Sequence, residues 1–338
     1  MLKKLLSVLL TCIMIMGIMA GCGSNNEESS STNNQADTPN EKVTVKVGSL
    51  KGATSMGIVS LMDNNANETA ANNYEFTMVT AADELLTKVV SGELDIALVP
   101  ANVASVLYNK TEGKVSVINI NTLGVLYIVT GDESIKTLED LKGKTLYLTG
   151  KGTTPDYVIQ YLLEENGLLD DVTLEYKSEA TEIAALLKES PESVGLLPQP
   201  FATVACTNNE RLEIVIDLTE QWDSIQGDNG SKLVTGVTIV RNEFLEKNEE
   251  AVKTFMTEHQ DSADFTNTNV EKAAELIVAT GIIEKAPIAV KAIPYCSITY
   301  IDGNDMKNAL SGYLEVLFNR EKTSIGGKLP TDDFYYMP

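Results

Sequence analysis

The chain has 338 residues, 43% of them hydrophobic, and a formal net charge of −22 at pH 7. This acidic balance argues against nucleic acid or anionic lipid as a partner, because both repel a negatively charged surface. His259 is the only histidine, which removes most hydrolytic triads and histidine-based metal sites, so we expect no catalytic residue, no metal and no cofactor.

Residues 1–21 have the layout of a secretory signal peptide. Two lysines precede an apolar run over 5–19, and two small residues precede Cys22. The run is shorter than the ~20 apolar residues of a membrane-spanning helix. The segment resembles a bacterial lipobox. This resemblance implies that Cys22 carries acyl chains such as palmitate, which anchor the protein to the cell membrane on its extracytoplasmic side. An ordinary signal peptide followed by an incidental cysteine is the alternative.

Residues 22–42 are rich in Ser, Asn, Gln, Glu and Thr and have almost no apolar side chains. Such a segment cannot bury enough surface to offset the entropy lost on ordering. We therefore expect a lipidated, flexible tether that lets the folded part stand off the membrane.

The next region predicts alternating strands and helices. Apolar and polar residues alternate over the first strand, and glycine or proline bounds the later apolar runs. We expect strands over 43–50, 74–79 and 94–99, with helices over 55–63 and 81–91. Near-continuous apolar strands separated by helices call for a parallel sheet with helices on its faces.

The same order begins again after Leu123. We expect strands over 124–130, 144–149, 173–176, 194–197 and 212–218, with helices over 138–141, 156–166 and 179–188. Two repeats of one layout imply two similar α/β lobes.

The remaining chain is mainly helical. Residues 232–240 predict one more strand, and amphipathic patterns predict helices over 243–257, 269–280, 288–292 and 303–319. We therefore expect one lobe over 43–123 and 241–338 and a second lobe over 124–240. The chain would cross between them near 124–130 and 232–240, and two crossing strands form a hinge that permits closure.

Four loops follow strands of these lobes, over residues 51–56, 100–102, 150–157 and 198–201. In open α/β sheets ligands bind beyond the carboxyl ends of the strands, near helix N-termini. The 150–157 loop is the most informative, since its two glycines free the backbone and its threonines offer hydroxyls. An ordinary capped helix start is the alternative.

Four segments stand out in combination: LKGATSMG, SGELDIALVPANVA, IKTLEDLKGKTLYLTGKGTTPDYVIQYLLEENGL and VGLLPQPFATVA. Together they resemble the solute-binding proteins of nitrate, sulfonate, taurine and thiamine-precursor ABC importers, over roughly residues 43–330. The resemblance implies a bilobal α/β protein with the type II periplasmic-binding-protein fold, two parallel-sheet lobes and a ligand in the cleft between them. The ligand-binding residues it implies are Thr54, Ser55, Met56, Asn102, Thr153, Thr154, Tyr157, Gln199 and Phe201. Many relatives have an acidic residue where Gln199 stands, so a neutral hydrogen-bonding ligand group is favoured here.

The function implied is that of the extracytoplasmic substrate-binding component of an ABC importer. Such a protein captures a small polar organic solute, sulfonate- or taurine-like or pyrimidine- or heterocycle-like, and delivers it as a monomer to the permease and ATPase subunits. A ligand-binding surface sensor and an enzyme on the same fold are the alternatives.

Several other side chains bear on these alternatives. Aromatic candidates for stacking on a ligand are Tyr127, Tyr157, Phe201 and Trp222, the last in an expected polar loop. The acid pairs Asp83–Glu84, Glu93–Asp95 and Glu139–Asp140 are expected on solvated helix faces or ends, as is His259. Cys206 and Cys296 are expected as separate buried thiols rather than a disulfide.

Overall fold

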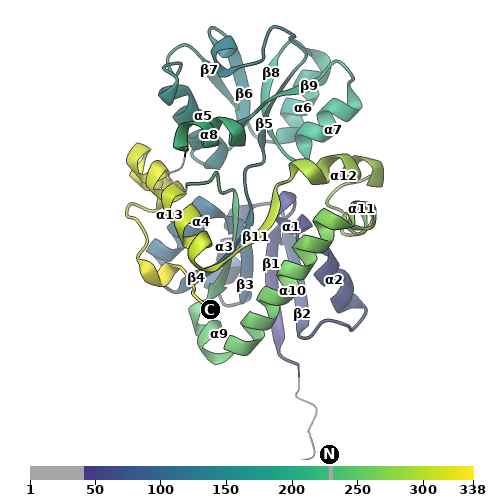
Figure 1. Ribbon diagram of the computed structural model, residues 1–338, viewed down its shortest axis with the longest axis vertical. Helices are drawn as coiled ribbons and strands as arrows, with labels where there is room; N and C mark the ends of the chain where they lie inside the picture. The colour runs from purple at the N-terminus through teal and green to yellow at the C-terminus, as the bar shows by residue number, and fades with distance from the viewer. Residues whose placement is uncertain (1–41, 228–230) are drawn as a thin grey trace, which may run out of the picture. The chain divides into compact units, whose positions relative to one another are not determined.

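The computed structural model describes residues 42–227 and 231–338, which form two lobes (Figure 1). The secretory signal, Cys22 and nearly all of the expected tether lie outside the described residues. No helix in the described part is long and apolar enough to cross a membrane.

The first lobe is built on a six-stranded sheet with the order β11-β4-β10-β3-β1-β2. Its strands are β1 (Thr44–Leu50), β2 (Asn73–Val79), β3 (Ile96–Pro100), β4 (Val115–Thr122), β10 (Gly236–Arg241) and β11 (Ile298–Ile301). The expected strands over 43–50, 74–79 and 94–99 are confirmed as β1, β2 and β3. The sequence pattern did not indicate β4, although all eight of its residues are buried.

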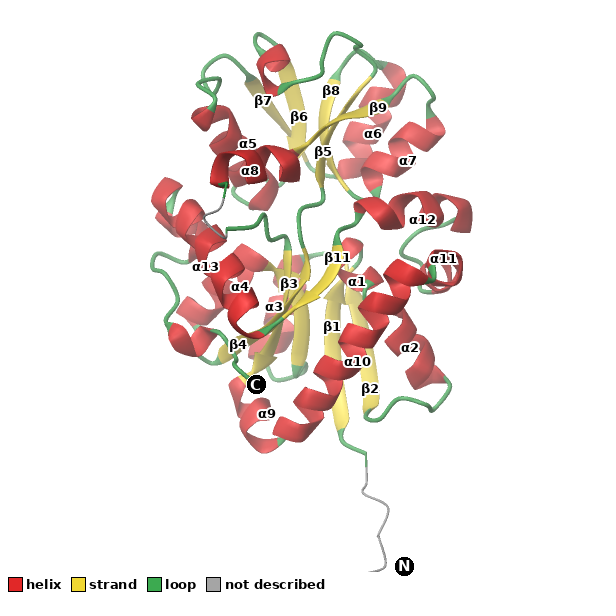
Figure 2. Ribbon diagram, viewed as in Figure 1, coloured by secondary structure: helices red, strands yellow, loops and turns green. Residues whose placement is uncertain are grey.

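Helices cover both faces of this sheet (Figure 2). Their bounds are α1 (Ala53–Met56), α2 (Val59–Ala66), α3 (Ala82–Val90), α4 (Ala101–Lys110), α9 (Asn242–Lys247), α10 (Glu249–Thr268), α11 (Val270–Ala279), α12 (Ala286–Ala292) and α13 (Gly303–Arg320). Short 3₁₀ turns occur at η2 (Ile293–Tyr295), η3 (Lys322–Ile325) and η4 (Asp332–Phe334). Helices α3, α4 and α13 contribute side chains to one apolar core, and α2 and α10 to another.

The second lobe is built on a five-stranded sheet with the order β7-β6-β8-β5-β9. Its strands are β5 (Leu126–Thr130), β6 (Thr145–Thr149), β7 (Thr173–Lys177), β8 (Val194–Pro198) and β9 (Glu213–Asp217). Its helices are η1 (Leu138–Leu141), α5 (Thr154–Glu165), α6 (Ala180–Glu189), α7 (Phe201–Asn208) and α8 (Leu218–Gln226). Every element expected over 124–218 is present, so the two-lobe α/β prediction is confirmed.

The expectation of purely parallel sheets is wrong, because each sheet contains antiparallel strands. Strand β5 pairs antiparallel with β8 and β9, and β10 pairs antiparallel with β3 and β4. Each is the first strand after the chain crosses between lobes. Each of these two strands therefore enters its sheet from the boundary between the lobes and runs antiparallel to the strands that end at that boundary.

Two short segments join the lobes, over residues 123–125 and 231–235, with residues 228–230 outside the described part. The Gly236–Arg241 strand belongs to the sheet of the first lobe, so the chain returns earlier than the expected boundary at residue 240. The Thr235 N–H donates to the Thr122 carbonyl at 3.1 Å, which holds the two crossings side by side. The described chain passes between the lobes at these two segments.

A glycine in one strand of each lobe allows a helix to pack closely on the sheet. A Cβ on Gly48 would lie 2.5 Å from side-chain atoms of Leu85 and Leu94. A Cβ on Gly195 would lie 2.7 Å from the Ile183 side chain. In each lobe, therefore, the missing side chain of a strand glycine lets a helix pack closely on the sheet, α3 on β1 and α6 on β8.

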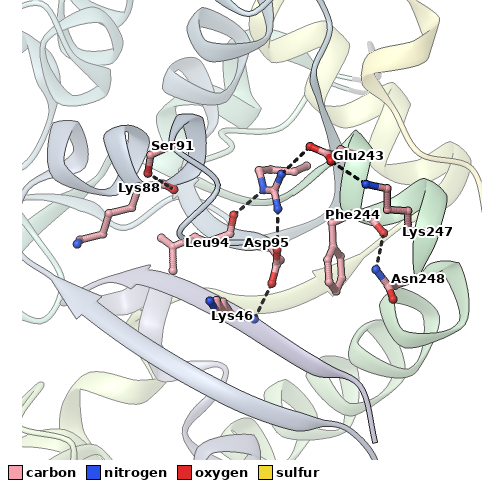
Figure 3. Close-up of polar contacts among 10 residues, drawn as sticks. Lys46, Lys88, Ser91, Leu94, Asp95, Glu243, Phe244, Lys247 and Asn248 are labelled. Atoms are coloured by element: carbon pink, nitrogen blue, oxygen red, sulfur yellow. Dashed lines mark hydrogen bonds and ion pairs between the residues drawn. The ribbon is translucent and has the colours of Figure 1, made fainter. Parts of the chain in front are cut away.

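A partly buried ion pair links Asp95, the residue before β3, to Arg241 at the end of β10 in the first lobe. The Arg241 guanidinium lies 2.8 Å from an Asp95 carboxylate oxygen, and their side chains are 19% and 9% exposed. Asp95 also accepts a hydrogen bond from the Lys46 N–H at 3.0 Å (Figure 3). The expectation that Asp95 is solvated is therefore wrong, because the sequence could not show that Arg241 lies beside it.

His259 is fully buried in α10, so its expected solvent-facing position is wrong as well. Its Nδ1 lies 3.3 Å from Asn119 Nδ2, and its Nε2 has no hydrogen-bond partner among the described residues. Burial lowers the pKa of this imidazole from 6.5 to about 3. The ring is therefore neutral at physiological pH. Cys206 and Cys296 are unpaired, as expected.

Candidate functional site

A cleft of about 600 Å³ opens between the two lobes. The residues that line it are Lys51, Gly52, Thr80, Ala81, Thr149, Gly150, Ser178, Glu179, Ala180, Thr181, Pro200, Phe201 and Ile282. All but Ile282 lie at or just after the carboxyl ends of β1, β2, β6, β7 and β8. This is the position at which open α/β sheets bind ligands, and the volume suits a small molecule.

The loop after β1 supplies Lys51 and Gly52 to the cleft wall. Thr54 is half-buried, and its hydroxyl donates to the Leu50 carbonyl at 3.1 Å. Ser55 is buried, and its hydroxyl bonds the Ser49 hydroxyl at 2.7 Å and the Leu50 carbonyl. These hydroxyls shape the turn rather than project from it.

Met56 is fully buried in an apolar cluster with Val59 and Ile293. It is not among the residues that line the cleft. The expectation that Met56 faces the ligand therefore finds no support in its position.

Asn102 and Thr154 meet across the lobe boundary. The Thr154 hydroxyl donates to Asn102 Oδ1 at 3.0 Å, and Asn102 Nδ2 donates to the Ser324 carbonyl at 3.2 Å. The two side chains are 4% and 5% exposed. In this conformation both are occupied in holding the lobes together.

The 150–157 loop begins α5 in the second lobe. Gly150 and Gly152 have φ angles of 73° and 74°, which only glycine adopts without strain. The exposed Thr153 is the N-cap residue, and its hydroxyl donates back to the Gly150 carbonyl at 2.5 Å. Gly150 lines the interlobe cleft, whereas Tyr157 lines a second cleft of about 490 Å³ between α5 and the end of α13.

The loop after β8 carries Gln199 and Phe201. Gln199 is buried, and its N–H donates to the Val125 carbonyl in the crossing segment at 2.9 Å. Its Oε1 accepts a long hydrogen bond of 3.4 Å from the Thr203 N–H, while its Nε2 has no partner in the described part of the chain. Phe201 is half-buried and lines the interlobe cleft.

Sequence reasoning missed the cleft residues that follow β2 and β7. Thr80 and Ala81 follow the last residue of β2, and residues 178–181 form the turn after β7 and the start of α6. The rule that located the other four loops applies equally to these two. They were overlooked because neither contains a glycine or proline to mark the turn.

Helix α13 of the first lobe reaches the second lobe at Arg320. The Arg320 guanidinium donates to Gln160 Oε1 at 3.0 Å and forms an ion pair with Glu164. On the other side of the hinge, the Tyr127 hydroxyl donates to the Tyr295 carbonyl at 2.9 Å. Burial raises the pKa of Tyr127 above its usual value, so the phenol remains a donor.

Trp222 is fully buried in α8, so its expected place in a polar loop is wrong. Its ring packs against Tyr161 of the same lobe, with centroids 5.1 Å apart. It also packs against Tyr313 of α13 at 5.5 Å. The chain's only tryptophan therefore lies at the contact between the lobes and not on the cleft wall.

Residues 61–191 match the family model described as "ABC transporter, phosphonate, periplasmic substrate-binding protein". The match runs from α2 in the first lobe to the end of α6 in the second, so it includes one crossing and the three cleft loops that follow β2, β6 and β7. In this stretch the chain is similar to the substrate-binding proteins of ABC transporters.

Solved structures share the fold of this chain. A crystal structure described as an ABC transporter from Parabacteroides distasonis aligns with a TM-score of 0.73 and 24% identity, over 88% of this chain and 99% of that chain. The periplasmic aliphatic sulphonate binding protein of Escherichia coli aligns with a TM-score of 0.68 and 13% identity, over 87% of this chain and 93% of that chain. At these identities the likeness establishes the periplasmic-binding-protein fold.

Curated relatives include putative binding proteins of Brucella abortus and Brucella suis. Each is 25% identical over 187 residues, which is 55% of this chain and 56% of the relative. The match thus spans about half the length of either protein.

Proposed function

We propose that this substrate-binding protein captures a small polar organic solute with a phosphonate or sulfonate group and delivers it to an ABC permease. The observation that carries the proposal is the interlobe cleft, whose walls come from the carboxyl ends of strands in both lobes. The phosphonate description of the matching family and the sulphonate binding protein of similar fold support this class of solute.

The chemistry of the cleft wall suits an oxyanion. Hydroxyls of Thr80, Thr149, Ser178 and Thr181 lie along it, beside the flexible backbone of the glycine turns. Hydroxyl and backbone N–H groups donate well to phosphonate or sulfonate oxygens, and a charged acceptor strengthens each bond. Phe201 supplies an apolar surface for the carbon part of the solute.

Closure follows from the hinge. Among the described residues, the chain crosses between the lobes at 123–125 and 231–235, so a small change of backbone angles there would move one lobe against the other. A solute that contacts both walls favours the closed arrangement by its differential affinity for that state. The closed form would then be recognised by the permease.

We also propose that the protein acts as a monomer held outside the cell membrane by lipid on Cys22. The segment before this cysteine carries the proposal. Intact mass spectrometry of membrane-fraction protein is expected to show removal of residues 1–21 and added acyl mass. A free Cys22 thiol in that fraction would contradict it.

The solute is tested by isothermal titration calorimetry with the purified full-length protein. Alkylphosphonates, alkylsulfonates, nitrate, inorganic phosphate and pyrimidines form the panel. We expect saturable binding of a phosphonate or sulfonate and a smaller radius of gyration by X-ray scattering when it is bound. Tighter binding of a pyrimidine would move the proposal to a heterocyclic solute, and no binding by any member would overturn it.

A further inference from the structure

A continuous series of buried side-chain hydrogen bonds joins β4 to β10 in the first lobe. The Thr122 hydroxyl donates to Asn121 Oδ1 at 2.8 Å, and Asn121 Nδ2 donates to the Thr238 hydroxyl at 3.0 Å. The Thr238 hydroxyl donates in turn to Asn119 Oδ1 at 2.9 Å, and Asn119 Nδ2 lies 3.3 Å from His259 Nδ1. We call these five residues the side-chain ladder. Each of their side chains is at most 2% exposed.

The donors of the side-chain ladder all point in one direction, from the end of β4 towards His259. Thr238 is the central link, because its hydroxyl both accepts and donates a hydrogen bond. Hydrogen bonds aligned in this way polarise one another, and a buried polar group that loses its partner is costly. The side-chain ladder therefore specifies a single arrangement of its members.

The backbone pairing of β4 and β10 is irregular on both sides of Thr238. The register shifts between Gly236 and Val237 and again between Thr238 and Ile239. A bulge leaves a residue unpaired and bends the strand, so backbone hydrogen bonds alone fix the geometry of this stretch less firmly. The hydrogen bonds of Thr238 to both asparagines join the two strands within this irregular stretch.

The side-chain ladder ends where the two crossing segments meet the loop after β1. Thr122 precedes the first crossing, and its carbonyl accepts the Thr235 N–H of the second. A Cβ on Gly236 would lie 2.5 Å from Asn121 Oδ1 and 2.8 Å from Thr54 Cγ2. The Asn121 amide and the loop after β1 thus pack directly against the end of the second crossing.

We infer that Thr238 is a positioning residue for solute capture, which acts through the side-chain ladder to hold the two crossing segments in the geometry from which the lobes close. The inference rests on the proposed function and assigns the control of its hinge motion. Thr238 lies inside the first sheet and is not among the residues that line the cleft, so its effect reaches the solute through the crossings. Without the side-chain ladder the crossings would sample more arrangements, and closure would cost more conformational entropy.

Thr238→Val tests this role, because valine resembles threonine in shape but has no hydroxyl. Amide hydrogen exchange is measured by NMR on the full-length protein without solute. We expect the Thr235 N–H, which bonds the Thr122 carbonyl, to exchange about tenfold faster or more than in the parent. Thr238→Ser keeps the hydroxyl and should exchange as the parent does, so an equal increase in both variants would overturn the inference.

Ser116→Ala is the matched control on the same strand. The Ser116 hydroxyl is also buried and donates to Asn242 Oδ1 at 2.9 Å, but it lies at the end of β4 away from the crossings. This variant should leave the exchange of the Thr235 N–H close to that of the parent. An equal increase in Ser116→Ala and Thr238→Val, or one spread evenly over the amides of β1 and β5, would indicate a merely structural role and overturn the inference.

Calorimetry separates this inference from the proposed function. Thr238→Val should bind the solute that the parent prefers about tenfold more weakly, whereas Ser116→Ala should bind it as the parent does. Unchanged affinity in Thr238→Val would overturn the positioning role while leaving the proposed function standing. If the parent binds no member of the solute panel, the proposed function falls, and the exchange of the Thr235 N–H still decides whether the side-chain ladder holds the crossings.

Discussion

Asn102 and Thr154 form a direct hydrogen bond between the lobes, 3.0 Å long and shielded from solvent. Asn102 lies in the first turn of α4, and Thr154 in the first turn of α5. Two loops predicted separately from sequence thus meet at a single contact. The bond exists only when the lobes are together, so it contributes to the closed arrangement alone.

Replacing Thr154 with Val should therefore weaken solute binding. The buried Asn102 Oδ1 loses its donor, which costs about 1–3 kcal/mol in the closed state. Calorimetry should show an affinity loss of roughly tenfold. Thr154→Ser keeps the hydroxyl and should bind nearly as the parent does, so an equal loss in both variants would contradict the role of the hydrogen bond.

Replacing Arg320 with Met should favour the open arrangement. Arg320 joins α13 to Gln160 and Glu164 on α5, and its side chain is only 15% exposed. A hydrogen bond to a charged group contributes about 1.5–3 kcal/mol, so the unliganded variant should show a larger radius of gyration by scattering. Lys322→Met, an exposed change close by, should have no such effect; a similar shift in both variants would contradict the assignment.

Replacing Asp95 with Asn should destabilise the first lobe strongly. The change removes the carboxylate from the partly buried Arg241 guanidinium, which keeps Glu243 and the Leu94 carbonyl as partners, so we expect a cost of about 1.5–3 kcal/mol. Urea unfolding followed by circular dichroism measures this loss. Glu243, the exposed partner of Arg241 at 3.4 Å, provides the control, since Glu243→Gln should cost less than about 1 kcal/mol.

His259 should make the protein less stable in mild acid. Because its folded-state pKa is lowered from 6.5 to about 3, the unfolded chain binds a proton that the folded chain does not between these pH values. The contribution of the neutral ring is fully present above pH 6.5 and is lost as the pH falls toward 3.

The free energy of unfolding, measured by urea denaturation between pH 7 and pH 5, should fall more steeply with decreasing pH for the parent than for His259→Gln. The difference in slope is at most about 1.4 kcal/mol per pH unit, which corresponds to one proton. Parallel slopes for the two proteins would show that His259 is protonated equally in both states.

The local spacing of apolar residues was enough to predict the order of strands and helices in both lobes, because each element has its own periodic pattern of apolar side chains. It failed where burial depends on a partner distant in sequence. Polar neighbours suggested that His259 and Trp222 were exposed, yet Trp222 packs against Tyr313 of α13, 91 residues later, and His259 against Tyr300 of β11, 41 residues later. Strand β4 was missed because its buried asparagines, Asn119 and Asn121, hide the apolar pattern.

The candidate site was predicted to the level of loops but not of side chains. The carboxyl ends of β1, β6 and β8 do line the cleft. Within those loops, however, Thr54 and Ser55 are turned to their own backbone and Met56 to the core. Side-chain direction in a turn depends on which hydrogen bonds the backbone leaves open, and the sequence does not reveal that.

The place of β10 in the first sheet has a consequence for biogenesis. This strand lies between β3 and β4, yet it follows them in the chain by more than a hundred residues, after the whole second lobe. The second lobe is contiguous and can complete its sheet as soon as it is synthesised, whereas the first remains split until β10 arrives. The edges of β3 and β4 that later pair with β10 therefore stay open until residues beyond 236 have been synthesised, so the first lobe completes its sheet after the second.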